Sequence, residues 1–225
     1  MRVAVLIPAL NEEQALPGVL QDLARVHDGR VVVVDNGSTD RTAEVARAHG
    51  AEVVHQPTRG YGSACLAGLG HLRADPPDVV VILDADHSDD PAEMASLLAP
   101  LQADAADMVL GERRTRAEPG ALTWPQRVGN RVATAGIRAF TGHRYRDMGP
   151  FRAVRWAALE RLEMQDPAFG WNVEMQMKAA RAGLRVLEVP VSYRDRQAGD
   201  SKISGTVRGT IKAGTGMLRA CWRYR

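Results

Sequence analysis

Two aspartates separated by one residue, Asp84 and Asp86, follow the apolar run at 79–83. Side chains alternate between the two faces of a strand, so carboxylates two positions apart can point the same way where a strand ends. Carboxylate oxygens are hard ligands that suit Mg²⁺ or Mn²⁺, especially an ion that also holds substrate phosphates. The pair therefore indicates a divalent-metal site, and the alternative is a solvated turn after a strand.

Strands and helices alternate through the first half of the chain. The pattern predicts strands at 2–7, 30–34, 51–54, 79–83 and 107–110, and helices at 12–26, 39–49, 62–73 and 91–103. Asn11, Ser38 and Asp90 are candidate helix N-caps. The alternation predicts βαβ units and hence an α/β fold with a mostly parallel sheet flanked by helices. Ligands of such sheets bind at the carboxyl ends of the strands, where the segments 8–13, 35–40, 56–62 and 84–86 fall.

The second half of the chain is less regular. We expect an exposed loop at 114–124, helices at 125–140, 152–162 and 171–182, a turn at 142–150 and a strand at 185–189. A mobile loop at 194–204 and a terminal helix at 205–225 follow. We expect residues 1–204 to form one domain, to which the basic amphipathic helix at 205–225 also belongs.

The composition narrows the class of protein. The 225 residues, 45% of them hydrophobic, are enough for one large globular domain. A net charge of +2, from 29 basic and 27 acidic residues, gives no case for a nucleic acid partner. Cys65 and Cys221 lie far apart, which favours neither a disulfide framework nor a zinc site. With no visible signal peptide and no apolar run of about 20 residues, we expect a cytoplasmic protein whose membrane contact is at most peripheral.

Five motifs, in order along the chain, resemble those of the family 2 glycosyltransferases with the GT-A fold. They are IPALNEE at 7–13, VDNGSTDRT at 34–42, DAD at 84–86, DMGPFR at 147–152 and EVPVSY at 188–193, the last followed by Arg196 and by GDSK at 199–202. The last group resembles the branch of dolichyl- or polyprenyl-phosphate mannose (or glucose) synthases. The resemblance covers about residues 3–204.

This resemblance implies the metal-dependent, inverting transfer of a hexose from a UDP- or GDP-sugar to a polyprenyl phosphate at the inner face of the cell membrane. It assigns Mg²⁺ or Mn²⁺ to Asp84 and Asp86, and the phosphates to Arg196, Ser201 and Lys202. The expected nucleotide-binding residues are Pro8, Ala9, Leu10, Asn11, Glu13, Asp35, Gly60, Gly62, Asp84 and Ala85. Asp35 could accept a hydrogen bond from a base imide, and the glycines would let a ligand approach the backbone, although an ordinary turn explains them as well.

The residues leave the acceptor chemistry open. A hydroxyl acceptor needs a general base, for which Asp147 and Glu174 are the candidates, whereas a phosphate acceptor is already anionic and needs mainly positioning. Each of the two could instead orient sugar hydroxyls or pair with an arginine. The alternative functions are a soluble transferase that acts on a small hydroxyl-bearing acceptor, and a nucleotide-sugar-binding protein without transfer activity.

Two further questions stay open. The branch commonly carries a glutamine where this chain has Ser88, which leaves the third metal ligand undetermined, with Asp89 and Asp90 as candidate replacements. The tail at 205–225 could lie on an anionic membrane surface, or its apolar stripe could pack against the enzyme's own core. The oligomeric state, the nucleotide base and the sugar do not follow from the sequence.

Overall fold

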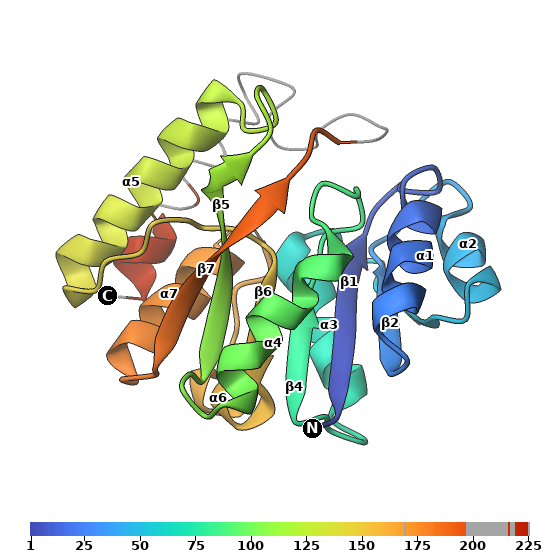
Figure 1. Cartoon of the computed structure of the whole chain (residues 1–225), viewed down its shortest axis with the longest axis horizontal. Helices are drawn as coiled ribbons and strands as arrows, with labels where there is room; N and C mark the ends of the chain where they lie inside the picture. Colours follow the sequence, from blue (N-terminus) through green and yellow to red (C-terminus); the bar gives the residue numbers. More distant parts are fainter. Residues whose placement is uncertain (169, 197–215, 217–218, 225) are drawn as a thin grey trace.

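The computed structural model of this protein describes residues 1–168, 170–196, 216 and 219–224. In chain order the elements are β1 (Val3–Ala9), α1 (Leu16–Val26), β2 (Arg30–Asp35), α2 (Thr42–Ala48), β3 (Glu52–His55), α3 (Tyr61–Leu72), β4 (Val79–Ile82), the 3₁₀ turn η1 (Pro91–Glu93), α4 (Met94–Gln102), β5 (Met108–Ala117), α5 (Trp124–Thr141), β6 (Arg152–Arg155), α6 (Trp156–Leu162), α7 (Trp171–Arg181) and β7 (Val186–Tyr193). They form one sheet with helices on both faces, as Figure 1 shows. The predicted α/β class is confirmed.

The sheet is mostly parallel, as predicted. Its strand order is β3-β2-β1-β4-β6-β5-β7, and only β6 among the described strands runs antiparallel to its neighbours. The register places Ala9 of β1 beside Asp35 of β2, and Asp35 beside His55 of β3. The ends of these strands, and the loops that follow them, therefore meet at one edge of the sheet.

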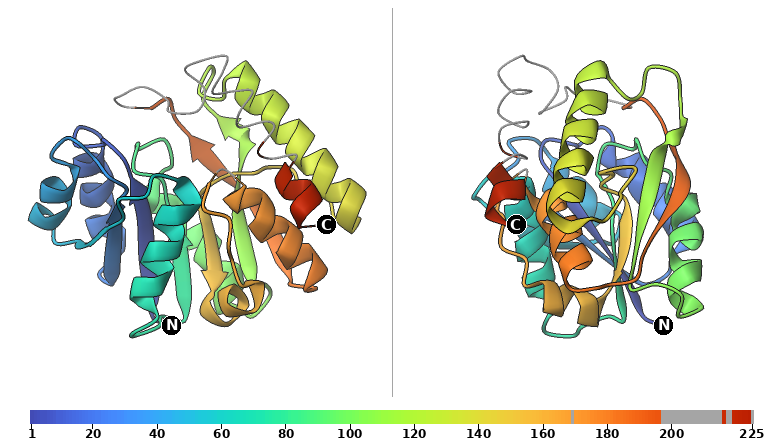
Figure 2. Two further views of the ribbon diagram at one scale, coloured as in Figure 1. Left: turned by 180° about the vertical axis from the view of Figure 1, so that it is seen from behind. Right: turned by 90° about the vertical axis from the view of Figure 1, so that its left-hand side faces the viewer.

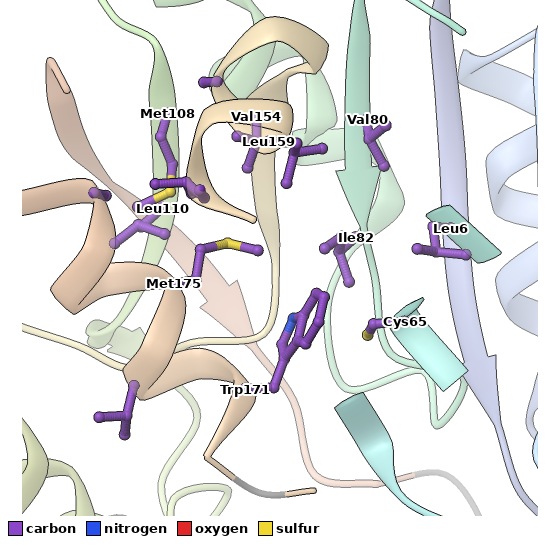
Figure 3. Close-up of a cluster of buried hydrophobic side chains, with 14 of the residues drawn as sticks. Leu6, Cys65, Val80, Ile82, Met108, Leu110, Val154, Leu159, Trp171 and Met175 are labelled. Atoms are coloured by element: carbon purple, nitrogen blue, oxygen red, sulfur yellow. The ribbon is translucent and has the colours of Figure 1, made fainter. Parts of the chain in front are cut away.

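Alternating side chains divide the core between the two faces of the sheet. Leu6 of β1 faces the cluster formed with α3, α5, α6 and α7, whereas its neighbour Ile7 faces the cluster formed with α1, α2 and α4. Figure 3 shows Trp171 and Met175 of α7 pointing toward Ile82 of β4 in the first cluster. Burial of one such large apolar side chain contributes about 1.5–3 kcal/mol, so these clusters fix the strands whose ends carry the site.

Residues 152–155 form the strand β6, where the sequence predicted the start of a helix. β6 pairs with β4 and β5, and its Ala153 lies opposite Val109. Arg152 is completely buried, and its guanidinium donates to backbone carbonyl oxygens, including that of Pro150 at 3.2 Å. Because an arginine ordinarily marks an exposed position in a sequence pattern, this buried strand could not be recognised from the sequence.

Strands β5 and β7 extend farther than predicted. β5 continues to Ala117, into the expected loop, and pairs there with Tyr193 at the end of β7. The register shifts between Glu112 and Arg116, which is the mark of a β-bulge. These extensions bring side chains of β5 and β7 to the edge of the sheet at which β4 ends.

The described part of the tail packs against the body of the protein. Residues 219–223 are helical, and Ala220 and Cys221 belong to the buried cluster that includes α5 and α7. The rings of Trp222 and Phe140 meet edge to face at 6.5 Å, and both views of Figure 2 place this helix beside α5 and α7. This contact agrees with the interpretation in which the tail packs against the enzyme's own core. Residues 205–215, 217, 218 and 225 lie outside the described residues. Among the helices that the structure describes, none has the length and apolar character to cross a bilayer.

Candidate active site

The loops that follow β1 and β2 are tied together by hydrogen bonds. The Asn11 N–H donates to Ser38 Oγ at 3.0 Å, and the Thr39 N–H donates to Asn11 Oδ1 at 2.8 Å. The Glu13 carboxylate accepts from the Arg41 N–H at 3.0 Å. These bonds use the side-chain oxygens of Asn11 and Glu13 to hold one loop against the other, at the place where the sequence expected direct contacts with a nucleotide.

Asn11 and Ser38 are not the helix caps that the sequence predicted. α1 begins only at Leu16 and α2 at Thr42, so both polar residues lie in the cross-linked loops. Asp90 does cap its helical turn, because its carboxylate accepts from a backbone N–H of η1 at 3.0 Å. Side chains that look like caps in a sequence can equally bond to a neighbouring loop, which only the fold reveals.

Asp35 presents a buried carboxylate at the end of β2. It is 5% exposed, one of its oxygens accepts from the Ser38 N–H at 2.9 Å, and the other lies 3.0 Å from His55 Nδ1. Burial opposes ionisation, but the hydrogen bonds from Ser38 and His55 lower the pKa of Asp35 below its ordinary value. Asp35 is therefore an anionic acceptor, and His55, which sequence reasoning missed, shares it.

Gly60 and Gly62 are required by the protein's own backbone. A Cβ on Gly62 would lie 1.9 Å from the carbonyl oxygen of Asp166, and a Cβ on Gly60 would lie 2.2 Å from that of Pro167. The Gly60 N–H donates to Asn36 Oδ1 at 2.7 Å. The close approach that the sequence attributed to a ligand is made by residues 166–167, so the two glycines give no evidence for a nucleotide.

Asp86 is held in one orientation by its neighbour Ser88. Its Oδ1 accepts from the Ser88 N–H at 3.0 Å and from the Ser88 hydroxyl at 2.6 Å. Its Oδ2 accepts from the Arg196 guanidinium at 2.8 Å. Arg196 also contacts Glu12 at 3.0 Å, so it bridges two carboxylates. Ser201 and Lys202, the other predicted phosphate ligands, lie outside the described residues.

Asp84 and Asp89 have no hydrogen-bond donor against their carboxylates in the part of the chain that the structure describes. Burial and the nearby charge of Asp86 raise the pKa of Asp84 to about 7. Asp89 is 1% exposed, both of its carboxylate oxygens lack a partner, and burial followed by the charge of Asp84 raises its pKa well above the ordinary value. Asp90, by contrast, is engaged by Arg194 and by η1. Of the two candidate replacements for a third ligand, Asp89 is the one whose oxygens are not used.

Asp147 is occupied by Arg113 and so does not have the geometry of a general base. It is 1% exposed, and it binds the Arg113 guanidinium through both oxygens, at 2.8 and 2.9 Å. Burial opposes its ionisation, but the Arg113 charge and hydrogen bonds lower its pKa. Asp147 therefore orients Arg113, whose guanidinium lies 4.9 Å from the centre of the Tyr193 ring. The sequence did not identify Arg113 as a site residue, because its partner lies 34 positions away.

Glu174 is a structural carboxylate. It is completely buried, accepts from the Gln165 N–H at 2.9 Å and the Asp166 N–H at 2.7 Å, and pairs with Lys178 at 2.7 Å. A carboxylate enclosed in this way cannot reach an acceptor. Its contacts instead hold the segment that packs on Gly60 and Gly62.

The carboxylates at the end of β4 have the chemistry of a divalent-metal site that depends on its substrate. Their oxygens are hard ligands, and among the described residues no three Asp, Glu, His or Cys side chains are arranged to hold an ion by themselves. Mg²⁺ commonly takes one or two carboxylates and completes its shell with substrate phosphates and water. Asp84 and Asp86 fit that description, and Arg113 and Arg196 supply cations nearby.

Comparison with known proteins gives a consistent result. Residues 4–162 match the family model described as Glycosyl transferase family 2. An uncharacterized glycosyltransferase of Mycobacterium tuberculosis is 45% identical over 215 residues, which cover 94% of each chain. The dolichyl-phosphate hexose transferase of Haloferax volcanii is 37% identical and is covered to 95%, with 99% of this chain. The undecaprenyl-phosphate mannosyltransferase of Micrococcus luteus is 34% identical and is covered to 90%, with 93% of this chain.

Solved structures show the same fold. Glucosyl-3-phosphoglycerate synthase from M. tuberculosis, in complex with Mg²⁺ and uridine diphosphate, superposes with a TM-score of 0.77 at 24% identity, over 98% of this chain and 79% of that one. The same enzyme with Mn²⁺, UDP-glucose and phosphoglyceric acid gives a TM-score of 0.76 at 24% identity, over 98% and 80% of the two chains. At this identity the likeness concerns the fold alone.

Proposed function

This chain belongs to glycosyl transferase family 2, has the GT-A fold and is a glycosyltransferase, and from that premise we propose its reaction. The protein transfers a hexose from a UDP- or GDP-sugar to a polyprenyl phosphate, with inversion at the anomeric carbon and with a divalent metal ion. The family membership supports an enzyme over a nucleotide-sugar-binding protein without transfer activity.

One observation carries this proposal: the carboxylates at the end of β4 lie near two arginines, Arg113 and Arg196. Arg196 contacts Asp86 at 2.8 Å, and the charge of Arg113 acts on Asp84. Carboxylates suit a metal ion, and guanidinium groups suit phosphate oxygens, which they bind with two parallel hydrogen bonds. A nucleoside diphosphate that leaves and a phosphate that attacks both need this combination of groups.

Asp86, with Asp84, would hold the metal ion between the protein and the donor diphosphate. The ion, when bound, supplies Lewis-acid stabilisation of the charge that develops on the leaving diphosphate. Ser88 fixes the orientation of the Asp86 carboxylate, and Arg196, which contacts the same carboxylate, would bind the phosphates of the donor. We propose that the nucleoside lies along the ends of β1, β2 and β4, where the contacting residues are Pro8, Ala9, Leu10, Asn11, Asp35 and Ala85.

We propose a phosphate as the acceptor because Arg113 can hold it and because, among the described residues, neither of the two carboxylates predicted as bases is available. Among the described residues, both predicted bases are engaged, Asp147 by Arg113 and Glu174 by backbone N–H groups. A phosphate oxygen is already anionic, so it can attack the anomeric carbon as the bond to the nucleoside diphosphate breaks, and no proton has to be removed. We assign the positioning of this phosphate to Arg113. The names of the relatives that act on dolichyl and undecaprenyl phosphates support the same class of acceptor.

A polyprenyl acceptor requires contact with the inner face of the cell membrane, and α5 with the C-terminal helix offers the surface for it. Trp124, Val132 and Trp222 are 75%, 38% and 61% exposed there. α5 carries Arg127, Arg131 and Arg138, and its sequence contains no acidic residue. Basic side chains beside exposed tryptophan are typical of surfaces that lie at the interface of an anionic bilayer. α5 begins two residues after Leu122, which shares an apolar cluster with Tyr193, and the Tyr193 ring contacts Arg113.

The test is turnover with a panel of radiolabelled nucleotide sugars, Mn²⁺ and undecaprenyl phosphate, followed by extraction into organic solvent. We expect label in the organic phase with one UDP- or GDP-sugar, and the same donor should raise the Tm of the protein only when Mn²⁺ is present. Asp86→Ala should remove both signals and stay folded. Transfer to a water-soluble hydroxyl acceptor without organic-phase product would contradict the proposed acceptor, and full activity in chelator would contradict the metal.

A further inference from the structure

The Arg196 guanidinium occupies the oxygen through which Asp86 would bind a metal ion. It lies 2.8 Å from Asp86 Oδ2 and 3.0 Å from Glu12 Oε1. The other Asp86 oxygen is held by the backbone and hydroxyl of Ser88. The Arg196 side chain is 24% exposed, so this ion pair is only partly screened by water.

From these contacts we infer that Arg196 is the internal counter-cation of the metal site, and that a divalent ion binds Asp86 only by displacing it. The inference rests on the proposed function, to which it adds a competition between the metal ion and Arg196 for Asp86. A metal ion and a guanidinium on one carboxylate oxygen repel each other, because both are cations and each needs the same lone pairs. The displaced guanidinium is then available to the donor diphosphate.

Contacts of every second residue in the segment 192–196 hold Arg196 beside Asp86. Ser192 Oγ donates to Glu93 at 3.1 Å, Arg194 pairs with Asp90, and Arg196 pairs with Asp86. Residues two apart point to the same side of an extended segment. Ser192, Arg194 and Arg196 therefore each meet an acidic side chain of the facing segment 86–93. The Arg194 N–H also donates to the Ser88 carbonyl oxygen at 2.8 Å. The contacts of Ser192 and Arg194 do not involve Asp86, so Arg196 can leave while they remain.

Ser88 determines which oxygen of Asp86 the metal ion and Arg196 compete for. The Ser88 backbone N–H and the Ser88 hydroxyl both donate to Asp86 Oδ1. Oδ2 is then the oxygen that remains for an incoming ion, and it is the one that Arg196 holds. Metal alone should therefore bind weakly, and a nucleoside diphosphate should strengthen it by providing new partners for the guanidinium. By linkage, metal should strengthen nucleotide binding by the same factor.

The experiment measures Mn²⁺ binding to the full-length protein by electron paramagnetic resonance and calorimetry, without nucleotide and then with UDP or GDP. In Arg196→Ala, Mn²⁺ alone should bind at least tenfold more tightly than in the wild type. The factor by which nucleotide strengthens Mn²⁺ binding should shrink. Arg194→Ala is the matched control, since it removes an arginine of the same segment that pairs with Asp90 and should leave Mn²⁺ affinity unchanged.

If Arg196→Ala does not fold, Arg196→Gln, which removes the charge but keeps hydrogen-bond donors, is measured instead. Unchanged or weaker Mn²⁺ binding in the folded variant would overturn the inference. An equal gain in Arg194→Ala would also overturn it, because the effect would then be one of general charge. The measurement without nucleotide decides this question even if the protein uses neither UDP nor GDP, so failure of the proposed function would be seen separately.

Discussion

Aspartates close to one another in this site have different roles because they have different partners. Asp147 is neutralised by a bidentate arginine and its pKa is lowered, whereas Asp84 meets no donor among the described residues and its pKa is raised to about 7. Asp86 lies between these cases, fixed by Ser88 on one oxygen. Burial and the neighbouring Asp86 charge disfavour the ionised form of Asp84, and a bound cation would favour it.

The raised pKa of Asp84 predicts a stability that depends on pH. Its carboxyl ionises in the unfolded chain near pH 4 but in the folded protein only near pH 7, so without metal its contribution to stability is lost as the pH rises between these values. We expect Asp84→Asn to raise the Tm at pH 8 by a few degrees, and by much less at pH 4.5. Thermal melts in chelator across this range measure it. A Tm difference that does not change with pH would show that Asp84 is ionised throughout.

Arg113 and Asp147 should act as one unit on the acceptor. Arg113→Lys keeps the charge but loses the bidentate geometry, so we expect the KM for the phosphate acceptor to rise about tenfold, with little change in donor KM. Asp147→Asn should produce a similar rise, and the pH dependence of kcat should keep its shape. Steady-state kinetics with each substrate varied checks this. A loss of kcat with an altered pH profile in Asp147→Asn alone would restore Asp147 as a base.

The residues that the sequence identified and those that it missed differ in one respect. Asp35 is the last residue of β2, and Asp84 and Asp86 follow β4 closely, so local pattern was enough to place them at the edge of the sheet. Arg113 and His55 take their positions from partners far along the chain, at separations of 34 and 20 residues. A single sequence contains no signal for such pairs.

At the level of elements, local pattern located the parallel strands but not their ends or the one antiparallel strand. The first four strands of the sheet lie where their apolar runs predicted. β6 was assigned to a helix because Arg152 interrupts its apolar pattern, and β5 was cut short because its extension is exposed and rich in arginine. Both errors come from charged residues whose burial or pairing depends on neighbouring strands.

The start of α3 should be intolerant of a side chain at Gly62. A Cβ there would lie 1.9 Å from the carbonyl oxygen of Asp166, whereas Gly70 in the same helix has no neighbour within 4 Å. We expect Gly62→Ala to destabilise the protein by about 1–3 kcal/mol through overpacking, and Gly70→Ala to stabilise it by about 0.5–1 kcal/mol. Denaturant unfolding of both variants without ligand tests this. If Gly62→Ala were as stable as the wild type but failed to bind nucleotide, the glycine would serve the ligand after all.

The surface of α5 should determine membrane binding. We expect the wild type to sediment with anionic vesicles in a manner that weakens with salt, and Trp124→Ala combined with Arg131→Glu and Arg138→Glu to lose most of this binding. Arg47→Glu on α2 is the control for a change of charge elsewhere. The triple variant should still use a short, water-soluble acceptor phosphate. Wild-type vesicle binding by the triple variant would assign the membrane contact to another surface.

At the scale of the whole molecule, two buried clusters on either side of the sheet fix the strands, and the strand ends carry the chemistry. Asp35, Asp84, Asp86 and Arg196 belong to strand ends or to the segments that follow them, and Arg113 lies within β5, where its register against β7 shifts. The fold class and the edge that carries the site could therefore be predicted from the order of the motifs. The motifs also implied a phosphate acceptor, but whether a general base is used could not be predicted, because it depends on which carboxylates the folded chain has already paired.

We propose above all that this enzyme glycosylates a phosphate and needs no base to do so. The most direct measurement compares two acceptors that differ in one group, a short-chain polyprenyl phosphate and the corresponding free alcohol, with the active nucleotide sugar and Mn²⁺. We predict that label is transferred to the phosphate, that chelator stops the transfer, and that the alcohol is not used. Transfer to the alcohol at a comparable rate, or to the alcohol alone, would contradict the account.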